Sequence, residues 1–211
     1  MNTTGAREIA QKLLQIQAVK LNIESPYTWA SGSKSPIYCD NRKALGYPYV
    51  RDFIKSELAA VIFEQFANAE IIAGVATAGI PWGAMVADQL KLPFMYVRPK
   101  PKEHGMGNQV EGMYQAGQQV VVVEDLISTG KSSLQVCEVL RNEGLIIEGM
   151  VSIFNYGFAT AEQAFSDANI KLISLSNYSA LIENAQSNGI MNEAQINALL
   201  KWRENPAAWG K

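Results

Sequence analysis

The sequence predicts an α/β protein with a central, mostly parallel sheet flanked by helices. The main observation is a repeated alternation of short β-branched runs with helical patterns. The runs are IIAGV (71–75), PFMYV (93–97), QVVVV (119–123) and IIEGMVSIF (146–154). Continuous apolar runs of this length are typical of strands buried on both faces, and their alternation with helices indicates βαβ units. With 211 residues, 48% of them hydrophobic, the chain is expected to form a single domain.

Helices are expected between and around these strands. Ile9, Leu13, Leu14 and Ile16 recur at three- and four-residue steps, which predicts a first amphipathic helix over 4–18, packing as a lid or dimer element. The other helices are expected over 49–66, 79–90, 130–144, 160–169 and within 191–211. Gly144 is expected at a helix C-terminus, and the last helix is expected to pack through Ile196, Leu199 and Leu200.

Between the first two helices, residues 25–48 read SPYTWASGSKSPIYCDNRKALGYP. This segment is rich in Ser, Gly and Pro and carries four aromatic residues. We expect an ordered functional loop around a short strand at 36–39, whose aromatic rings need something to stack on.

Composition excludes several classes of function. A net charge of −2 gives no basic surface for duplex nucleic acid. Cys39 and Cys137 lack metal-ligand spacing and are interpreted as reduced thiols, so no zinc site is expected. The N-terminus has no long apolar core, which argues against a signal peptide or membrane span and makes the cytoplasm the expected location.

The stretch VVVVEDLISTGKSS (120–133) places two acids directly after a buried strand that is expected to end at Glu124. In an open parallel sheet, ligands bind beyond the carboxyl ends of the strands. A nucleotide phosphate loop would require glycine where Asp125 stands, and two carboxylates would repel a polyphosphate. The stretch therefore does not predict a phosphate-loop NTPase.

A ribose 5-phosphate fits the same stretch better. Carboxylates accept hydrogen bonds from a cis-diol, and STGKS offers hydroxyls, backbone N–H groups and a helix N-terminus to a monophosphate. The alternative is that Glu124 and Asp125 lie in a solvated loop and STG only caps a helix.

A second segment of functional interest, YVRPKPKEHGMGNQVEG (96–112), contains Arg98, Lys100, Lys102 and the single histidine, His104. A cationic, glycine-rich loop of this kind could close over a diphosphate leaving group and exclude water. The alternative is a solvated basic connection.

VVVVEDLISTGKSS resembles the ribose-phosphate signature of type I phosphoribosyltransferases. Together with RPKPKEHGMGNQ and SGSKSPIYCDNR, it makes residues 29–154 resemble the orotate phosphoribosyltransferase family. The resemblance implies a type I phosphoribosyltransferase fold with a small N-terminal hood, the hood lying at about 1–45 and C-terminal helices at about 178–205. It also implies transfer of the 5-phosphoribosyl group from 5-phosphoribosyl 1-diphosphate to orotate, in pyrimidine biosynthesis. Mg²⁺ would be held mainly by the substrates rather than by protein ligands.

The resemblance further implies a homodimer whose loop 98–112 is shared across subunits, with no nucleic acid or membrane partner. Catalysis is implied for Lys102, Glu124 and Asp125, and orotate binding for Ser128, Lys34 and Arg42. The residues implied to bind phosphoribosyl diphosphate are Thr77, Ala78, Arg98, Lys100, Lys102, His104, Glu124, Asp125, Leu126, Ile127, Ser128, Thr129, Gly130, Lys131 and Ser132.

The chain departs from the family pattern at several positions. Many members carry Tyr-Lys where this chain has Thr77 and Ala78, so GVATAGIP (74–81) is either the diphosphate-side loop or a plain strand-to-helix turn. Ala30 replaces a lysine, and Pro99 replaces a cation whose role Lys100 is expected to take.

The usual arginine after Phe154, which holds the orotate carboxylate in the family, is absent here, because the chain reads NYGF. Ser128 and nearby backbone N–H groups are expected to take that role, helped by Lys34 or Arg42. The alternative is that Lys34 and Arg42 make only structural pairs.

Two rival functions share the ribose-phosphate stretch. A purine phosphoribosyltransferase would not carry the loop RPKPKEHGMGNQ. A non-catalytic regulator that binds DNA would need an additional basic domain, for which this acidic chain has no room.

Overall fold

The computed structural model describes residues 3–29, 32–100, 108–206 and 209. Within these ranges a six-stranded sheet has the strand order β10-β9-β8-β5-β6-β7, and its neighbours are parallel except for the antiparallel pair β6–β7. Its strands are β5 (Ile71–Val75), β6 (Phe94–Val97), β7 (Val110–Glu111), β8 (Gln119–Ile127), β9 (Ile146–Asn155) and β10 (Leu172–Asn177). The predicted α/β class with a mostly parallel sheet is confirmed.

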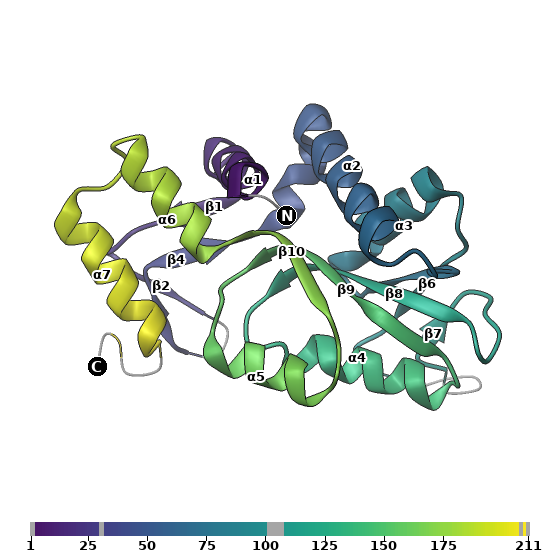
Figure 1. Cartoon of the computed structure of the whole chain (residues 1–211). Helices are drawn as coiled ribbons and strands as arrows, with labels where there is room; N and C mark the ends of the chain where they lie inside the picture. Colours follow the sequence, from purple (N-terminus) through teal and green to yellow (C-terminus); the bar gives the residue numbers. More distant parts are fainter. Residues whose placement is uncertain (1–2, 30–31, 101–107, 207–208, 210–211) are drawn as a thin grey trace.

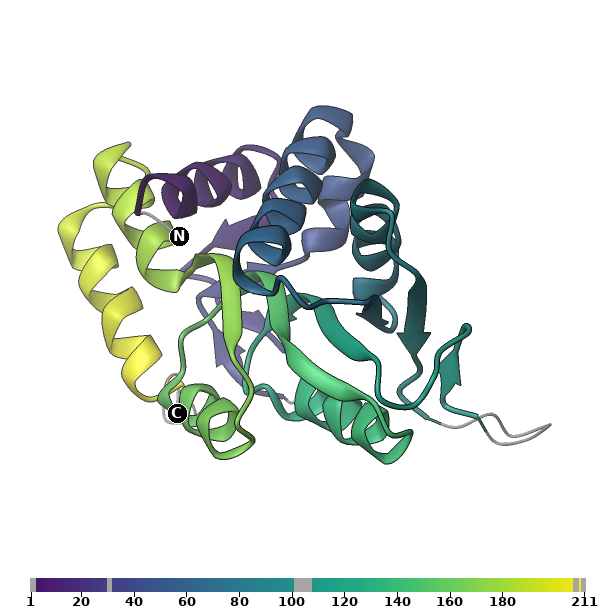
Figure 2. The same ribbon diagram turned by 45° about the vertical axis from the view of Figure 1, so that its right-hand side comes forward.

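Helices cover both faces of the sheet (Figure 1). One face carries α1 (Thr3–Gln15), α2 (Pro48–Gln65) and α3 (Gly79–Leu90), and the opposite face carries α4 (Lys131–Asn142) and α5 (Ala159–Asp167). Beyond β10, α6 (Tyr178–Ser187) and α7 (Glu193–Glu204) close one side of the molecule (Figure 2). In the described part of the chain, no helix combines the length and the apolar character needed to cross a membrane.

The segment between α1 and α2 forms two small antiparallel pairs. β1 (Val19–Leu21) pairs with β4 (Ile37–Cys39), and β2 (Tyr27–Thr28) pairs with β3 (Lys34–Ser35). A 3₁₀ helix, η1 (Asn41–Gly46), then leads into α2. The strand predicted at 36–39 is therefore confirmed.

The aromatic residue Trp29 of this segment finds its ring partners within the protein. The Trp29 ring lies 5.3 Å from Tyr156 and 5.8 Å from Trp202, centre to centre. These contacts join the N-terminal segment to the loop after β9 and to α7.

Most helix boundaries lie within two residues of the predictions, and the first and last helices each need a correction. The first helix ends at Gln15 rather than 18, because the chain turns at Gln17 (φ 55°) to bring β1 beside β4. In the last helix, Leu200 is 38% exposed and Trp202 is fully buried instead, continuing the three-residue spacing of Ile196 and Leu199.

The first helix was predicted as a lid or dimer element, and in the structure it packs on its own chain. Ile9 and Leu13 are fully buried, and Ser176 Oγ of β10 donates to the Ala6 carbonyl at 2.7 Å. Arg7 pairs with Glu183 of α6 at 2.7 Å. α1 therefore covers the β10 side of the sheet.

Strand β8 does not end at Glu124 as predicted but continues to Ile127. Its partner β9 is ten residues long, so Glu124 still pairs with Ser152 and Ile127 with Asn155. On its other side, β8 pairs with β5. The last residue pair there is Val123 with Gly74, so residues of β8 after Val123 have no strand neighbour on that side. Glu124 and Asp125 are therefore strand residues with one open side.

Candidate active site

The strand order places a ligand crevice between β5 and β8. From β5 the chain moves outward to β6, whereas β8, β9 and β10 follow in order on the other side of β5. In open α/β sheets, such a reversal opens a crevice beyond the carboxyl ends of the two central strands. The loop after β5 and the acids of β8 both lie there.

Glu124 is buried, with 6% of its surface exposed. Its Oε1 accepts from the Asp125 backbone N–H at 2.9 Å, and its Oε2 accepts from Ser133 Oγ at 3.1 Å. Burial raises the pKa of Glu124 well above its ordinary value, and the neighbouring Asp125 charge raises it further. The solvated-loop interpretation is therefore wrong for Glu124.

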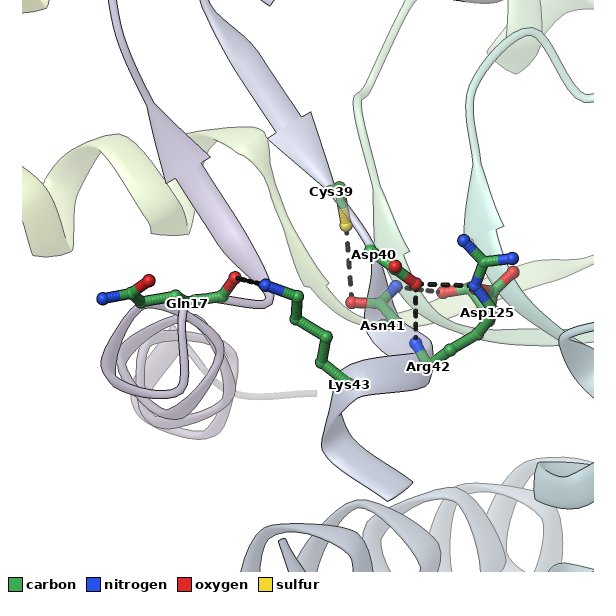
Figure 3. Close-up of polar contacts among 7 residues, drawn as sticks. All are labelled: Gln17, Cys39, Asp40, Asn41, Arg42, Lys43 and Asp125. Atoms are coloured by element: carbon green, nitrogen blue, oxygen red, sulfur yellow. Dashed lines mark hydrogen bonds and ion pairs between the residues drawn. The ribbon is translucent and has the colours of Figure 1, made fainter. Parts of the chain in front are cut away.

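Asp125 is less buried than Glu124 and has a different set of neighbours (Figure 3). Burial raises its pKa, while the Glu124 hydrogen bond and the Arg42 charge act in the opposite direction. Its backbone carbonyl accepts from Asn41 Nδ2 at 2.7 Å. This bond ties the N-terminal segment directly to β8.

Asn41 is fully buried and was missed by the sequence reasoning. Besides its bond to Asp125, its Oδ1 accepts from Cys39 Sγ at 3.4 Å (Figure 3). Burial raises the pKa of the Cys39 thiol, so Cys39 keeps the proton that it donates. Ser133 was missed as well, although the second serine of GKSS was a usable signal.

Ser128, Thr129 and Gly130 connect β8 to α4, which begins at Lys131. Gly130 takes a φ of 76°, and an added Cβ would lie 2.7 Å from the Phe165 ring. The N-cap is Gly130, and no side chain among the described residues caps this helix. The N-terminal N–H groups of α4 thus remain available to an anion, which argues against the interpretation of STG as a helix cap.

Two residues of the predicted phosphoribosyl diphosphate set face the core. Ile127 is fully buried, and Leu126 packs against the same core. Their side chains position the loop, whereas Thr129, Lys131 and Ser132 are exposed beside it.

The loop after β5 leads directly into α3. Thr77 is exposed, Ala78 is half-buried, and the peptide bond between Ala76 and Thr77 is cis. A Cβ added at Gly79 would collide with the Val123 carbonyl oxygen of β8. Glycine at position 79 therefore lets the N-terminus of α3 sit against the strand that carries the two acids.

The cationic segment is described only in part. Arg98 N–H donates to the Gln109 carbonyl at 2.9 Å, and its Nη1 lies 3.5 Å from Glu111 Oε1, at the base of the β6–β7 hairpin. Lys100 is exposed. Lys102 and His104 lie outside the described residues.

A cavity of about 700 Å³ adjoins the phosphate loop. Ser128 and Thr129 line it together with Lys34 of β3. Its remaining described lining is Trp29, Ser33, Phe158, Ala159, Thr160, Trp202, Arg203, Glu204, Asn205 and Pro206. Two of the three residues implied to bind orotate, Ser128 and Lys34, thus meet at one cavity.

The third residue, Arg42, does not line this cavity. Its Nε donates to Asp40 Oδ1 at 2.6 Å, and its charge also acts on Asp125 (Figure 3). Lys34 Nζ donates to Thr28 Oγ1 at 2.8 Å. Arg42 and Lys34 therefore each have a nearby protein partner, as expected if they make structural pairs. Across the described ranges, no group of three or more His, Cys, Asp or Glu side chains is arranged to hold a metal ion.

The fold is that of an α/β protein with two acids and a helix N-terminus at one crevice. A family model described as "Phosphoribosyl transferase domain" matches residues 53–178, so the chain belongs to the class of phosphoribosyltransferases. The chain is 52% identical over 203 residues to the orotate phosphoribosyltransferase of Bacteroides fragilis, covering 96% of each chain. It is 52% identical over the full length of both chains to that of Cytophaga hutchinsonii. The crystal structure of orotate phosphoribosyltransferase from Aeropyrum pernix is 31% identical, with a TM-score of 0.75, covering 87% of this chain and 99% of the other. The chain belongs to the orotate phosphoribosyltransferase family.

Proposed function

We propose that the protein transfers the 5-phosphoribosyl group of 5-phosphoribosyl 1-diphosphate to orotate, giving orotidine 5′-phosphate and diphosphate in pyrimidine biosynthesis. The observation that carries the choice of acceptor is the 52% identity, over 96% or more of the chain, to enzymes named for orotate. The two acids of β8 and the N-terminus of α4 fit the ribose 5-phosphate part of the donor. The protein is accordingly a pentosyltransferase.

Departure of diphosphate leaves a sugar with oxocarbenium character, so the reaction needs no enzyme nucleophile. Asp125, with its side chain beside the open crevice, accepts hydrogen bonds from the ribose hydroxyls. Glu124 holds the Asp125 backbone through its hydrogen bond to the Asp125 N–H. The Asp125 carboxylate adds negative potential near the developing positive charge. Ser128, Thr129, Gly130, Lys131 and Ser132 bind the 5-phosphate at the N-terminus of α4.

The leaving diphosphate faces the other side of the crevice. Backbone N–H groups near Thr77 and Ala78 receive it, at the N-terminus of α3. Arg98, Lys100, Lys102 and His104 supply positive charge from the loop 98–112 of a neighbouring subunit in a homodimer. Closure of this loop would exclude water from the reactive sugar.

Mg²⁺ fits this arrangement as a cation carried by the substrates. The Asp125 carboxylate lies at the crevice, and a hard oxygen donor of this kind suits Mg²⁺ that retains substrate and water ligands. Asp125 would lie beside it, and bound Mg²⁺ would supply charge neutralisation to the leaving diphosphate. We place the protein in the cytoplasm, without nucleic acid or membrane partners.

The acceptor is tested by the loss of orotate absorbance after 5-phosphoribosyl 1-diphosphate and Mg²⁺ are added. We expect orotate to be consumed and orotidine 5′-phosphate to form, with no change when the donor is omitted. Parallel reactions with purine bases test the rival phosphoribosyltransferase activity. Intact orotate in the complete reaction would refute the assignment.

A further inference from the structure

The cavity beside Ser128 has a second cation that the sequence reasoning did not consider. Arg203 lies in the last turn of α7 and lines the cavity together with Lys34 of β3. These residues are 169 positions apart in the chain, and only the packing of α7 brings them to the same cavity.

Two neighbours on α6 orient the Arg203 guanidinium. Its Nη1 donates to Ser179 Oγ at 2.7 Å, and its Cζ lies 5.8 Å from the centre of the Tyr178 ring. This bond engages one of five N–H donors. Among the described residues, Arg203 has no carboxylate within ion-pair distance, in contrast to Arg7, Arg42, Arg51 and Arg98. A guanidinium held in this way can bind a carboxylate through two parallel hydrogen bonds.

The remaining walls of the cavity suit a flat ring. Trp29, Phe158 and Trp202 line it, and their apolar surfaces favour a planar aromatic ligand. The edge-on contact between Trp29 and Trp202 holds two of these rings in place. The charged side chains of the lining are the cations Lys34 and Arg203 and the acid Glu204, so the cavity keeps an excess of positive charge. Aromatic walls with this excess are complementary to a planar ring that carries one negative group.

We propose that Arg203 binds the carboxylate of the acceptor base and, with Lys34, replaces the arginine that this chain lacks after Phe154. The inference rests on the proposed function, because it assigns a residue to the orotate of that reaction. It explains how NYGF can follow Phe154 while the orotate carboxylate still has a cationic partner. The anion-binding side chain comes from α7 instead.

The test compares Arg203→Gln with wild type in steady-state kinetics for each substrate. We expect KM for orotate to rise about 10- to 100-fold, the effect of losing charge-assisted hydrogen bonds. KM for phosphoribosyl diphosphate should stay within about twofold, because the donor binds at α3 and α4. Arg203→Lys keeps the charge but not the planar fork, so its KM for orotate should lie between those of wild type and the Gln variant.

Lys201→Gln is the matched control, since Lys201 is exposed on the same helix and does not line the cavity. It removes the same charge and should leave both KM values unchanged. An unchanged orotate KM in Arg203→Gln, or equal increases for both substrates, would overturn the inference. Thermal melts show whether each variant is folded. If Arg203→Gln is unfolded, the test uses Arg203→Lys, and a raised orotate KM in that variant supports the inference while an unchanged one overturns it. An inactive wild type would instead refute the proposed function.

Discussion

Glu124 and Asp125 are neighbours in the chain but occupy different surroundings. Because successive side chains of a strand point to opposite faces, Glu124 enters the interior beside Ser133, while Asp125 lies nearer the surface and to Arg42. The sequence predicted a functional acid pair at this sheet edge. It did not separate the two acids, because the separation depends on β8 continuing to Ile127.

Replacing Glu124 by Gln should stabilise the fold at high pH. The raised pKa of Glu124 means that its contribution to stability is complete below the unfolded-state pKa and is lost as pH rises through the folded-state pKa. Gln does not ionise, can accept from the Asp125 N–H and can donate to Ser133 Oγ. Thermal melts should therefore show a larger gain in Tm over wild type at pH 8 than at pH 4. A gain that is independent of pH would contradict the burial of this charge.

Asn41→Ala should weaken both the fold and the reaction. The change leaves the Asp125 carbonyl without the Asn41 donor, which typically costs about 1–3 kcal/mol. It also frees the β8 backbone at Asp125, so kcat should fall. Urea unfolding and steady-state kinetics measure the two effects.

Asn188→Ala provides the matched control for Asn41→Ala. Asn188 Nδ2 donates to the Asn184 carbonyl at the end of α6, away from the crevice. We expect this variant to keep wild-type kcat. If the two variants were equally active, Asn41 would have no role in positioning Asp125.

At the scale of elements, the two helix N-termini of the crevice were predicted to within a residue. α3 begins at Gly79 as expected, and α4 begins at Lys131 rather than at Gly130. Glycine, small hydroxyl residues and an apolar run are local signals, so they are readable from the chain.

In contrast, strand β10 was not predicted, because its serines interrupt the apolar pattern. Ser174 Oγ and Ser176 Oγ are satisfied by Ser152 and Ala6, partners far away in the sequence.

Gly79→Ala should displace α3 from β8. The new Cβ would meet the Val123 carbonyl oxygen, a backbone atom of the central sheet that cannot move easily. We expect a loss of about 1–3 kcal/mol in unfolding free energy and a higher KM for phosphoribosyl diphosphate. Gly46→Ala has open space around its Cβ and should stay within about 0.5 kcal/mol of wild type. Equal stability of the two variants in urea would show that α3 can shift without cost.

At the scale of the whole molecule, the shared-loop proposal predicts complementation between two inactive proteins. Lys102→Ala should lose the cation supplied in trans, and Asp125→Asn should lower kcat about 100- to 1000-fold while remaining folded. After subunit exchange, each mixed dimer would contain one intact site. About a quarter of wild-type activity should return if exchange is random.

Activity of the mixture is compared with that of each variant alone, and size-exclusion chromatography reports the dimer. Activity that stays at the level of the separate variants, although dimers exchange, would refute sharing of the loop. Lys102 would then act within its own subunit.

The sequence by itself determined the α/β class, the ribose-phosphate stretch and the family resemblance, because strand composition, helix starts and contiguous motifs are local properties of the chain. Tertiary structure alone decided which distant residues complete the site. Asn41 reaches Asp125 across 84 positions, and Arg203 reaches the cavity of Lys34 through the packing of α7. Such contacts arise from the order of strands and the burial of rings such as Trp202, which no local pattern contains. The same holds for Glu124, whose raised pKa comes from burial and not from its neighbours in the sequence alone.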